Sequence, residues 1–248
     1  KNIGFLLVIL ITLLRSENSR NDLFQILKND NINHLKMTSG DIITIISGQF
    51  SPKISDIDVR DIEIFCTSIE KFLSRNSFTE DFIYQKSQSS ISGSKHFRYQ
   101  QLYNGIPVQG RFLDIHCNTH HQISSLSNDY QLIEDVNVIP RITPEMALNI
   151  VKKKTGGILL IKPNPELIIY TYKSAPILAY SIRLISRYDS KKIVVNASSG
   201  EVINIFSLIY FEGPILGSGE NLLGEWVDSL YVYEGIDFPS ITGGLSTE

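Results

Sequence analysis

Three histidines and a cysteine lie within one short stretch, where the sequence reads HCNTHH over His116–His121. Imidazole and thiolate are ligands that zinc prefers, so this stretch is a candidate metal site. A site needs side chains that converge on one point, whereas successive strand residues point to opposite faces. His116 and Cys117 are therefore expected on opposite faces, with His120 and His121 in the following turn. An exposed hairpin tip is the favoured interpretation, and a metal- or small-ligand-binding envelope protein is the alternative.

Other stretches with catalytic or phosphate-binding potential lack residues that the chemistry requires. Gly217–Gly224 reads GSGENLLG, without the G-K-[ST] ending whose lysine reaches a phosphate and without the third glycine of a dinucleotide fingerprint. Lys152–Lys154 fits a helix C-terminus, where cations complement the helix dipole. The sequence contains no H-E-x-x-H and no G-x-S-x-G motif. These observations favour a binding, folding or inhibitory protein, and leave it uncertain whether the chain is an enzyme.

The composition is that of a globular protein. The 248 residues are 42% hydrophobic and 20% charged, with a net charge of -3. This balance gives no electrostatic reason to expect a nucleic acid or an anionic membrane as partner. The length allows one large domain or two small ones.

The start of the chain has the features of a secretory signal peptide. The first residue is Lys1 and not Met, which indicates a fragment or a processed product. The apolar run Ile3–Leu14 is shorter than the roughly 20 residues that a membrane-spanning helix needs. We therefore expect a signal peptide over residues 1–19, cleaved near Ser16–Ser19, although no A-x-A site follows. A buried or interfacial helix is the alternative.

Only two cysteines occur, Cys66 and Cys117. They could pair in an exported protein, and two buried free thiols are an equally good interpretation. The sequence therefore leaves disulfide formation open, but it excludes a disulfide-rich scaffold.

The first half of the chain predicts a helix packed on an antiparallel sheet. Ile42–Ser47 is rich in β-branched residues, while apolar positions over Val59–Leu73 recur at helical spacing, with Asp58 as N-cap. The turn Asn104-Gly105 joins two of the strands that follow, because both residues tolerate positive φ. The preceding segment, Asn21–Gly40, is polar and mixed. The strands are expected over Phe82–Gln88, Lys95–Tyr103, Val108–Cys117 and Gln122–Gln131.

A second helix-then-sheet unit follows a linker at Asn137–Thr143. Thr143 is a good N-cap, Pro144 suits the first helical position, and Gly156-Gly157 ends the helix. The fold class is therefore α+β, with two consecutive helix-on-antiparallel-sheet units. The strands of the second unit are expected over Glu166–Tyr172, Ile177–Ser186, Lys191–Asn196 and Glu201–Tyr210.

The predicted hairpin His96–Gly110 reads HFRYQQLYNGIPVQG and resembles the signature of the fungalysin/thermolysin propeptide (FTP) domain. The family pattern is similar to H-x-R-φ-Q-Q-x-Y-x-G-I-P-V-x-G, where φ is aromatic. ISGQFS at Ile46–Ser51 and EKFL at the end of the first helix resemble earlier parts of that domain. The chain matches the signature at His96, Arg98, Tyr99, Gln100, Gln101, Tyr103, Gly105, Ile106, Pro107, Val108 and Gly110.

The second unit resembles a PepSY domain, which has a cystatin-like fold and follows the FTP domain in thermolysin-like precursors. TPEMAL resembles its helix start, ILAYSIRL its L-A-Y strand, and VVNASSGEVIN the pattern V-D-A-x-T-G-E-V-L. Asn196 and Ser199 depart from the usual Asp and Thr, and both residues suit a tight turn. The matching residues are Ala147, Leu178, Ala179, Tyr180, Asn196, Gly200 and Glu201.

The segment GSGENLLGEWVDSLYVYEG resembles the first residues of a mature thermolysin-family catalytic domain. The resemblance as a whole covers about Gly40 to Gly235. It implies a signal peptide at 1–19, an FTP domain at 20–136, a PepSY domain at 137–212 and an incomplete catalytic domain at 213–248.

The resemblance implies the pro-region of a secreted thermolysin-like zinc metalloendopeptidase, acting as intramolecular chaperone and inhibitor until proteolytic processing. The His96–Gly110 hairpin is then not an active site. Its alternating aromatic and polar residues are expected to build a core for folding and a surface on which a protease docks. Leu208–Gly219 is expected to run into or beside the active-site cleft. Processing is expected near Glu212, Gly213, Pro214, Leu216, Gly217 and Gly219.

The same resemblance sets expectations for cofactors and partners. This chain is expected to hold no catalytic residue, metal site or cofactor, whereas zinc and calcium belong to a catalytic domain beyond Glu248. The expected partner is that catalytic domain in cis. The protein itself is expected to be extracellular and monomeric, and not to stay inserted in a membrane. A stand-alone secreted inhibitor or chaperone of the FTP-PepSY type is the alternative.

Overall fold

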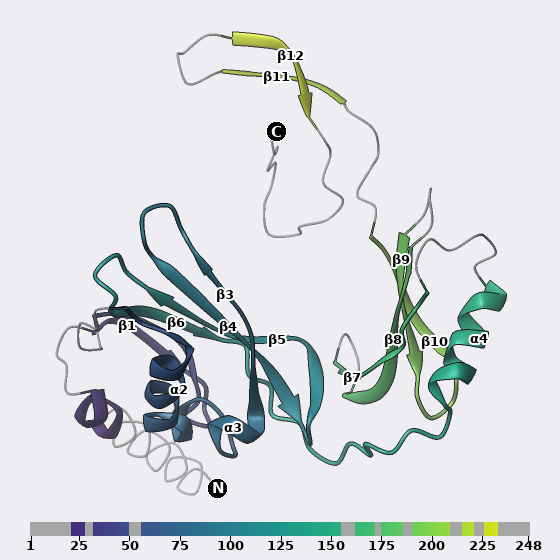
Figure 1. Ribbon diagram of the computed structural model, residues 1–248, viewed down its shortest axis with the longest axis horizontal. Coiled ribbons are helices and arrows are strands. Elements are labelled where there is room, and N and C mark those ends of the chain that lie inside the picture. The colour runs from purple at the N-terminus through teal and green to yellow at the C-terminus, as the bar shows by residue number, and fades with distance from the viewer. Residues whose placement is uncertain are drawn as a thin grey trace, which may run out of the picture. The chain divides into compact units, whose positions relative to one another are not determined.

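The computed structural model describes residues 21–27, 32–49, 56–154, 162–171, 175–185 and 190–208, and the backbone of two later strands. The chain divides into two compact units, the first comprising Lys1–Pro140 with Leu167–Ala179 and the second Arg141–Glu166 with Tyr180–Glu248. Figure 1 labels the elements of both units. The expected signal peptide at 1–19 lies outside the described residues.

A six-stranded antiparallel sheet forms the centre of the first unit, with strand order β1-β2-β6-β5-β4-β3. The start of β5 also pairs in parallel with β7 (Glu166–Tyr170), where Val108 lies opposite Ile169. The six strands span Ile32–Met37 (β1), Ile43–Gly48 (β2), Phe82–Ser89 (β3), Lys95–Tyr103 (β4), Ile106–Cys117 (β5) and Ile123–Asn128 (β6).

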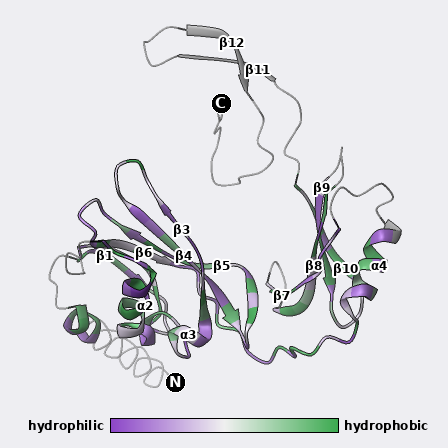
Figure 2. Ribbon diagram, in the orientation of Figure 1, coloured by the Kyte–Doolittle hydropathy of each residue, from purple (hydrophilic) through white to green (hydrophobic). Residues whose placement is uncertain are grey.

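Helices cover one face of this sheet and bury its apolar side chains (Figure 1). Helix α2 (Val59–Ser68) starts at Asp58, whose carboxylate accepts a bond from the Asp61 N–H at 3.0 Å, while the Asp61 carboxylate accepts one from the Asp58 N–H at 3.0 Å. This reciprocal capping box satisfies backbone donors that have no partner inside the helix. In Figure 2, edge strand β3 is coloured mostly hydrophilic, in agreement with its exposure. The core comprises Leu23, Ile43, Ile46, Ile57, Ile62, Cys66, Ile69, Phe72, Leu73, Phe78, Phe82, Phe97, Tyr99, Leu113, Ile115, Cys117, Ile123 and Leu126.

The predicted helix over Val59–Leu73 is too long. Helix α2 ends at Ser68, because Ile69 leaves helical geometry with φ -119° and ψ 16°, and the 3₁₀ turn η1 (Glu70–Phe72) follows. Ile69 and Leu73 are both buried, so the apolar stripe continues across the break. Periodicity of hydrophobic residues therefore could not locate the end of the helix.

Strand β1 and the short helix α3 (Phe78–Asp81) of the first unit were not predicted from the sequence. Strand β1 lies in the segment that reads as polar and forms an edge of the sheet. Ile32, Leu35 and Met37 pack against the core, but two register shifts interrupt the period-2 alternation that predicts a strand. Strand β1 joins β2 through a turn in which the Thr38 hydroxyl accepts a hydrogen bond from the Ile42 N–H at 3.2 Å. Helix α3 buries Phe78.

The second unit repeats the helix-then-sheet order in a smaller form. Helix α4 (Pro144–Lys154) begins after Thr143, whose hydroxyl accepts a hydrogen bond from the Met146 N–H at 3.2 Å. Its strands lie in the order β8 (Ile177–Ile185), β9 (Ser190–Asn196) and β10 (Val202–Ser207), with β8 belonging to this unit from Tyr180 onward. The predicted α+β class is confirmed. Within the described ranges, no helix is long and apolar enough to cross a membrane.

Candidate functional site

The predicted signature lies on the β4–β5 hairpin, and its residues alternate between two faces of the sheet. Phe97, Tyr99 and Gln101 are buried, whereas His96 is exposed and Arg98 is half-buried. We call the side opposite the core the open face. It consists of Lys86 and Gln88 of β3, His96 and Arg98 of β4, Asp114 and His116 of β5, and Ser125 and Ser127 of β6, which the strand register places in two rows.

On the core face, Tyr99 is an aromatic anchor with only 1% of its surface exposed. Its ring meets Phe78 edge-on at a centroid distance of 5.3 Å and Tyr84 at 5.7 Å. Its hydroxyl reaches the Val59 carbonyl only at 3.5 Å. Burial raises the pKa of this phenol well above its ordinary value. Tyr99 therefore contributes through packing and stays neutral.

Gln101 is a buried polar residue that holds the chain after β6. Its Nε2 donates to the Gln131 carbonyl at 2.7 Å, and its Oε1 accepts from the Gln131 N–H at 3.0 Å. Gln101 is 2% exposed, and its side-chain amide makes the two hydrogen bonds to the Gln131 backbone that a neighbouring strand would otherwise make. The role of this signature residue is thus structural.

Gln100 bridges a register shift in the hairpin. Next to the Asn104-Gly105 turn, Tyr103 faces Ile106, but beyond the shift Gln100 faces Phe112. Gln100 Nε2 donates to the carbonyls of Val108 at 2.6 Å and Arg111 at 2.8 Å, and so bonds two backbone groups within the irregular stretch. The predicted positive φ of the turn is present, at 48° for Asn104 and 77° for Gly105.

Gly110 lies inside this irregular stretch with φ +72°, in the left-handed region that glycine adopts without steric cost. No heavy atom lies within 4 Å of where its Cβ would be, so the backbone conformation alone favours glycine. The remaining signature residues of β5 flank the shift, with Pro107 opposite Leu102 and Val108 fully buried.

On the open face, Arg98 forms a two-pronged ion pair with Asp114. Arg98 Nε lies 2.7 Å from Asp114 Oδ1 and Arg98 Nη2 lies 3.0 Å from Asp114 Oδ2. The guanidinium carbon lies 4.8 Å from the Phe112 ring centroid. The hydrogen bond to Asp114 raises the pKa of Arg98 further. The pair is half-buried, with side-chain exposures of 39% and 27%, and so remains accessible to a partner.

In the adjacent row of the open face, His96 lies directly opposite His116. Their Nδ1 atoms are in hydrogen-bonding contact, and the ring centroids lie 4.6 Å apart with an interplanar angle of 79°. Burial, and secondly His96, lower the pKa of His116 below its ordinary value. Both histidines line a groove of about 540 Å³ together with Lys86, Gln88, Phe97, Arg98, Asp114 and Ser127.

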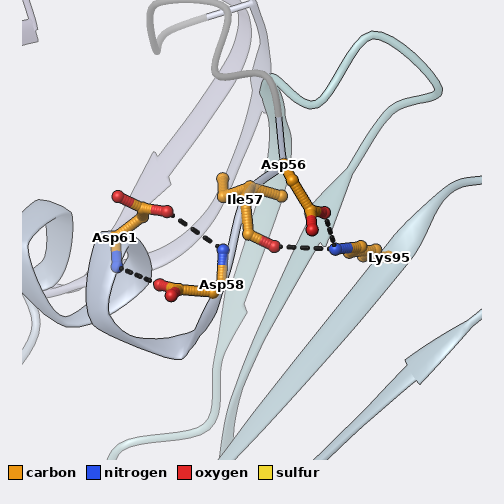
Figure 3. A network of polar contacts seen from close by, with 5 residues as sticks. All are labelled: Asp56, Ile57, Asp58, Asp61 and Lys95. Carbon is orange, nitrogen blue, oxygen red and sulfur yellow. Dashed lines mark hydrogen bonds and ion pairs between the residues drawn. The ribbon is translucent and has the colours of Figure 1, made fainter.

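The start of β4 is fixed to the entry of helix α2. Figure 3 shows Lys95 reaching both the Asp56 carboxylate, at 2.5 Å, and the Ile57 carbonyl, at 2.9 Å. Asp56 is exposed, and its hydrogen bond to Lys95 lowers the pKa of its carboxyl. This contact ties the helix cap of Asp58 and Asp61 to the strand that presents His96 and Arg98.

The histidines and the cysteine of the candidate stretch His116–His121 do not form one cluster. Cys117 points into the core, whereas His116 belongs to the open face, and Asn118–His121 forms a turn. Among the described residues, no group of three or more His, Cys, Asp or Glu side chains could hold a metal ion. Both thiols are free and buried in the structure. Burial raises the pKa of Cys66 and raises that of Cys117 to about 11.

The residues of the second signature are placed on α4, β8 and the β9–β10 turn. Ala147, Leu178, Ala179 and Tyr180 are buried, and the Tyr180 hydroxyl donates to the Ile142 carbonyl at 3.0 Å.

Asn196 organises the β9–β10 turn. Its Oδ1 accepts hydrogen bonds from the Ser198 N–H at 2.8 Å and the Ser199 N–H at 3.1 Å. Gly200 has φ +76°, and a Cβ there would lie 3.0 Å from Ile150 Cδ1 of the helix. The Glu201 carbonyl closes the turn by accepting from the Asn196 N–H at 2.8 Å. The departure to Asn at position 196 is therefore compatible with a tight turn, because its side chain caps two N–H groups.

The residues predicted for processing fall into two groups. Glu212, Gly213 and Pro214 lie outside the described residues. Leu216, Gly217 and Gly219 belong to strand β11 (Ile215–Glu220), which pairs antiparallel with β12 (Trp226–Val232).

Sequence reasoning missed Asp114, Phe112 and Gln131 as partners of the signature. An uninterrupted ladder from the Asn104-Gly105 turn would place Arg98 opposite Arg111, but the register shift places it opposite Asp114. Gly110, a glycine inside the predicted strand, was the available signal for this register shift, because a glycine within a strand often marks a β-bulge.

Residues 80–130 match the family described as Fungalysin/Thermolysin Propeptide Motif. Bacillolysin of Brevibacillus brevis is 25% identical over 157 residues, which cover 58% of this chain and 29% of that protein. The chain thus spans less than a third of the length of this relative. The solved C-terminal domain of Bacillus megaterium YpeB matches with a TM-score of 0.40 and 13% identity, covering 78% of this chain and 97% of that one.

The matched propeptide motif runs from the end of α3 through β6 and contains the whole predicted signature. Together with the similarity to a bacillolysin, it confirms the predicted resemblance to a thermolysin-family propeptide.

Proposed function

We propose that this chain, whose residues 80–130 carry a fungalysin/thermolysin propeptide motif, is the pro-region of a thermolysin-like zinc metalloendopeptidase precursor. It acts as an intramolecular chaperone and inhibitor of the catalytic domain until proteolytic processing. The observation that carries the proposal is that the motif coincides with strands β3–β6, which combine a rigid core face with an accessible polar face.

A folding template needs a surface that is already ordered when its partner is not. Residues of the signature supply that order, because Tyr99 fills the core while Gln100 and Gln101 bond backbone groups of β5 and of the segment after β6. The open face then presents Arg98 and Asp114 in a fixed geometry. We propose that this face docks on the catalytic domain, since half-buried paired charges give orientation and specificity at an interface.

The remaining parts of the precursor follow from the same proposal. A signal peptide over residues 1–19 directs secretion, and Leu208–Gly219 runs into or beside the active-site cleft. Processing falls within Glu212–Gly219, while zinc and calcium bind the catalytic domain alone. The pro-region acts as a monomer on its own catalytic domain in cis.

The proposal is tested first by sequencing the transcript past the codon for Glu248. We expect the frame to run on to an H-E-x-x-H motif, whose two histidines bind zinc and whose glutamate acts as general base. The catalytic domain is then unfolded and refolded with and without this chain, followed by assays of peptide hydrolysis. The chain should increase the recovered active fraction and inhibit the refolded enzyme.

The outcomes separate the proposal from its alternative. A frame that stops near Glu248, with inhibition of a separate protease in trans, would establish a stand-alone inhibitor instead. A frame that encodes the peptidase, but whose refolding and activity do not respond to the chain, would overturn the chaperone and inhibitor roles.

A further inference from the structure

The contact between His96 and His116 serves neither the core nor the hairpin bulge. The two residues come from neighbouring strands, lie directly opposite each other, and turn their Nδ1 atoms toward one another. In the neutral pair, one Nδ1–H donates a hydrogen bond to the other Nδ1. The contact therefore marks a position where two imidazole nitrogens converge on one point, and a metal ion that displaces the shared proton would be bound by both.

We propose that His96 and His116 form a two-histidine site for a nitrogen-preferring divalent metal ion such as Zn²⁺. Imidazole nitrogen is a preferred ligand of zinc, copper and nickel, whereas calcium and magnesium require oxygen ligands. Zinc–nitrogen distances of 2.0–2.1 Å in a tetrahedral site separate two ligand atoms by about 3.4 Å. The imidazoles must therefore move slightly apart, which the exposed ring of His96 permits.

The surroundings decide what kind of site this is. Gln88 flanks His96 in the same row and Ser125 flanks His116, so the pair lies in a polar groove with room for water as further ligands. Lys86 and Arg98 line the same groove and oppose a cation, although Arg98 is neutralised by Asp114. These charges favour an exchangeable site over a permanent structural one.

A metal ion at this position would connect β4 to β5 beyond the register shift. The hairpin next to the turn is held by Gln100 and by the backbone ladder, while the far part presents the open face. The ion would thus stiffen the open face from its solvent side. The inference stands apart from the proposed function, and it departs from the expectation that this chain holds no metal.

The test is calorimetric titration of the tag-free full chain with ZnCl₂, with CaCl₂ as the oxygen-preferring control. We expect saturable binding of one Zn²⁺ and no binding of Ca²⁺. His96→Gln and His116→Gln should each weaken zinc binding roughly tenfold or more, since even second-shell losses at metal sites cost 10- to 100-fold. His120→Gln is the matched control, because it removes an exposed histidine from the neighbouring turn, and it should leave binding unchanged.

A second readout separates ligand loss from damage to the fold. Melting is measured with and without ZnCl₂, because an ion that binds only the folded state raises the melting temperature. The zinc-dependent rise should disappear in His96→Gln, while melting without zinc stays close to that of the native chain, since His96 is exposed. Absence of saturable binding to the native chain, unchanged binding in His96→Gln, or an equal loss in His120→Gln would each overturn the proposal.

Discussion

The two faces of β4 use alternate residues of one sequence signature for different purposes. On the core face, Tyr99 and Gln101 are almost fully buried, and their contacts reach α3 and the segment after β6. On the open face, His96 and Arg98 bond side chains of β5 while staying accessible. A match to the signature therefore reports two properties at once, a hairpin geometry and a surface, and substitutions can separate them.

The largest effect is expected for Tyr99→Ala. Removing a fully buried aromatic ring that packs on Phe78 and Tyr84 leaves a cavity, which costs about 3–5 kcal/mol of unfolding free energy. Urea unfolding followed by circular dichroism measures this loss. A cost below about 1 kcal/mol, as at exposed positions, would show that the core face does not hold the hairpin.

Tyr99→Phe is the matched control for that experiment. It keeps the ring and removes only a hydroxyl whose contact with the Val59 carbonyl is 3.5 Å long. We expect a change of less than about 1 kcal/mol, because a hydrogen bond of this length is weak.

An intermediate effect is expected for Gln101→Ala. The substitution leaves the N–H and the carbonyl of Gln131 without the amide that bonds both. Each unpaired group costs about 1–3 kcal/mol when buried, and partial access of water reduces the sum to about 2 kcal/mol. Hydrogen exchange at the Gln131 amide should accelerate in the variant more than exchange of the β4–β6 amides. Uniform acceleration would instead indicate general loss of stability.

The core side should also limit stability at alkaline pH. Burial raises the pKa of Tyr130 to about 12, and its hydroxyl donates to Asp81 at 3.2 Å. A raised folded-state pKa means that this contribution is complete below the ordinary value of about 10 and is lost as pH rises from about 10 to 12. Tyr130→Phe should flatten this decline at a cost of about 1 kcal/mol at pH 8. Urea midpoints between pH 8 and 11.5 measure it, and an unchanged slope in the variant would contradict the assignment.

Much of the fold follows from local sequence patterns. Strand β4 begins and ends where predicted, because buried and outward residues alternate along it and the Asn104-Gly105 turn fixes its end. Asp58 caps α2 and Thr143 caps α4 as predicted. The end of α2 was missed because the apolar stripe runs on through η1. Strand β1 was missed because two register shifts interrupt the alternation of its apolar residues Ile32, Leu35 and Met37.

The candidate site could be predicted only in part, because its contacts depend on register. Alternation along β4 places His96 and Arg98 on one face, but the turn alone would align Arg98 with Arg111. The shift near Gly110 replaces that like-charged pair by Arg98 with Asp114. The same shift places His116 opposite His96. The sequence alone groups His116 with its neighbours along the chain in HCNTHH. Pairing across strands carries this information, and spacing within one strand does not.

Arg98→Met is expected to have the smallest effect on stability. Its effect on inhibition of the catalytic domain should be the most specific. The ion pair is half-exposed, so its loss together with the contact to the Phe112 ring should cost about 1 kcal/mol. If the open face docks on the catalytic domain, inhibition should nevertheless weaken about tenfold or more, as expected for an arginine at an interface. Arg60→Met is the matched control, since it removes an exposed arginine from helix α2 and should leave inhibition unchanged. If Arg98→Met destabilised the chain as much as Tyr99→Ala, both faces of β4 would serve the fold, and the docking surface would have to lie elsewhere.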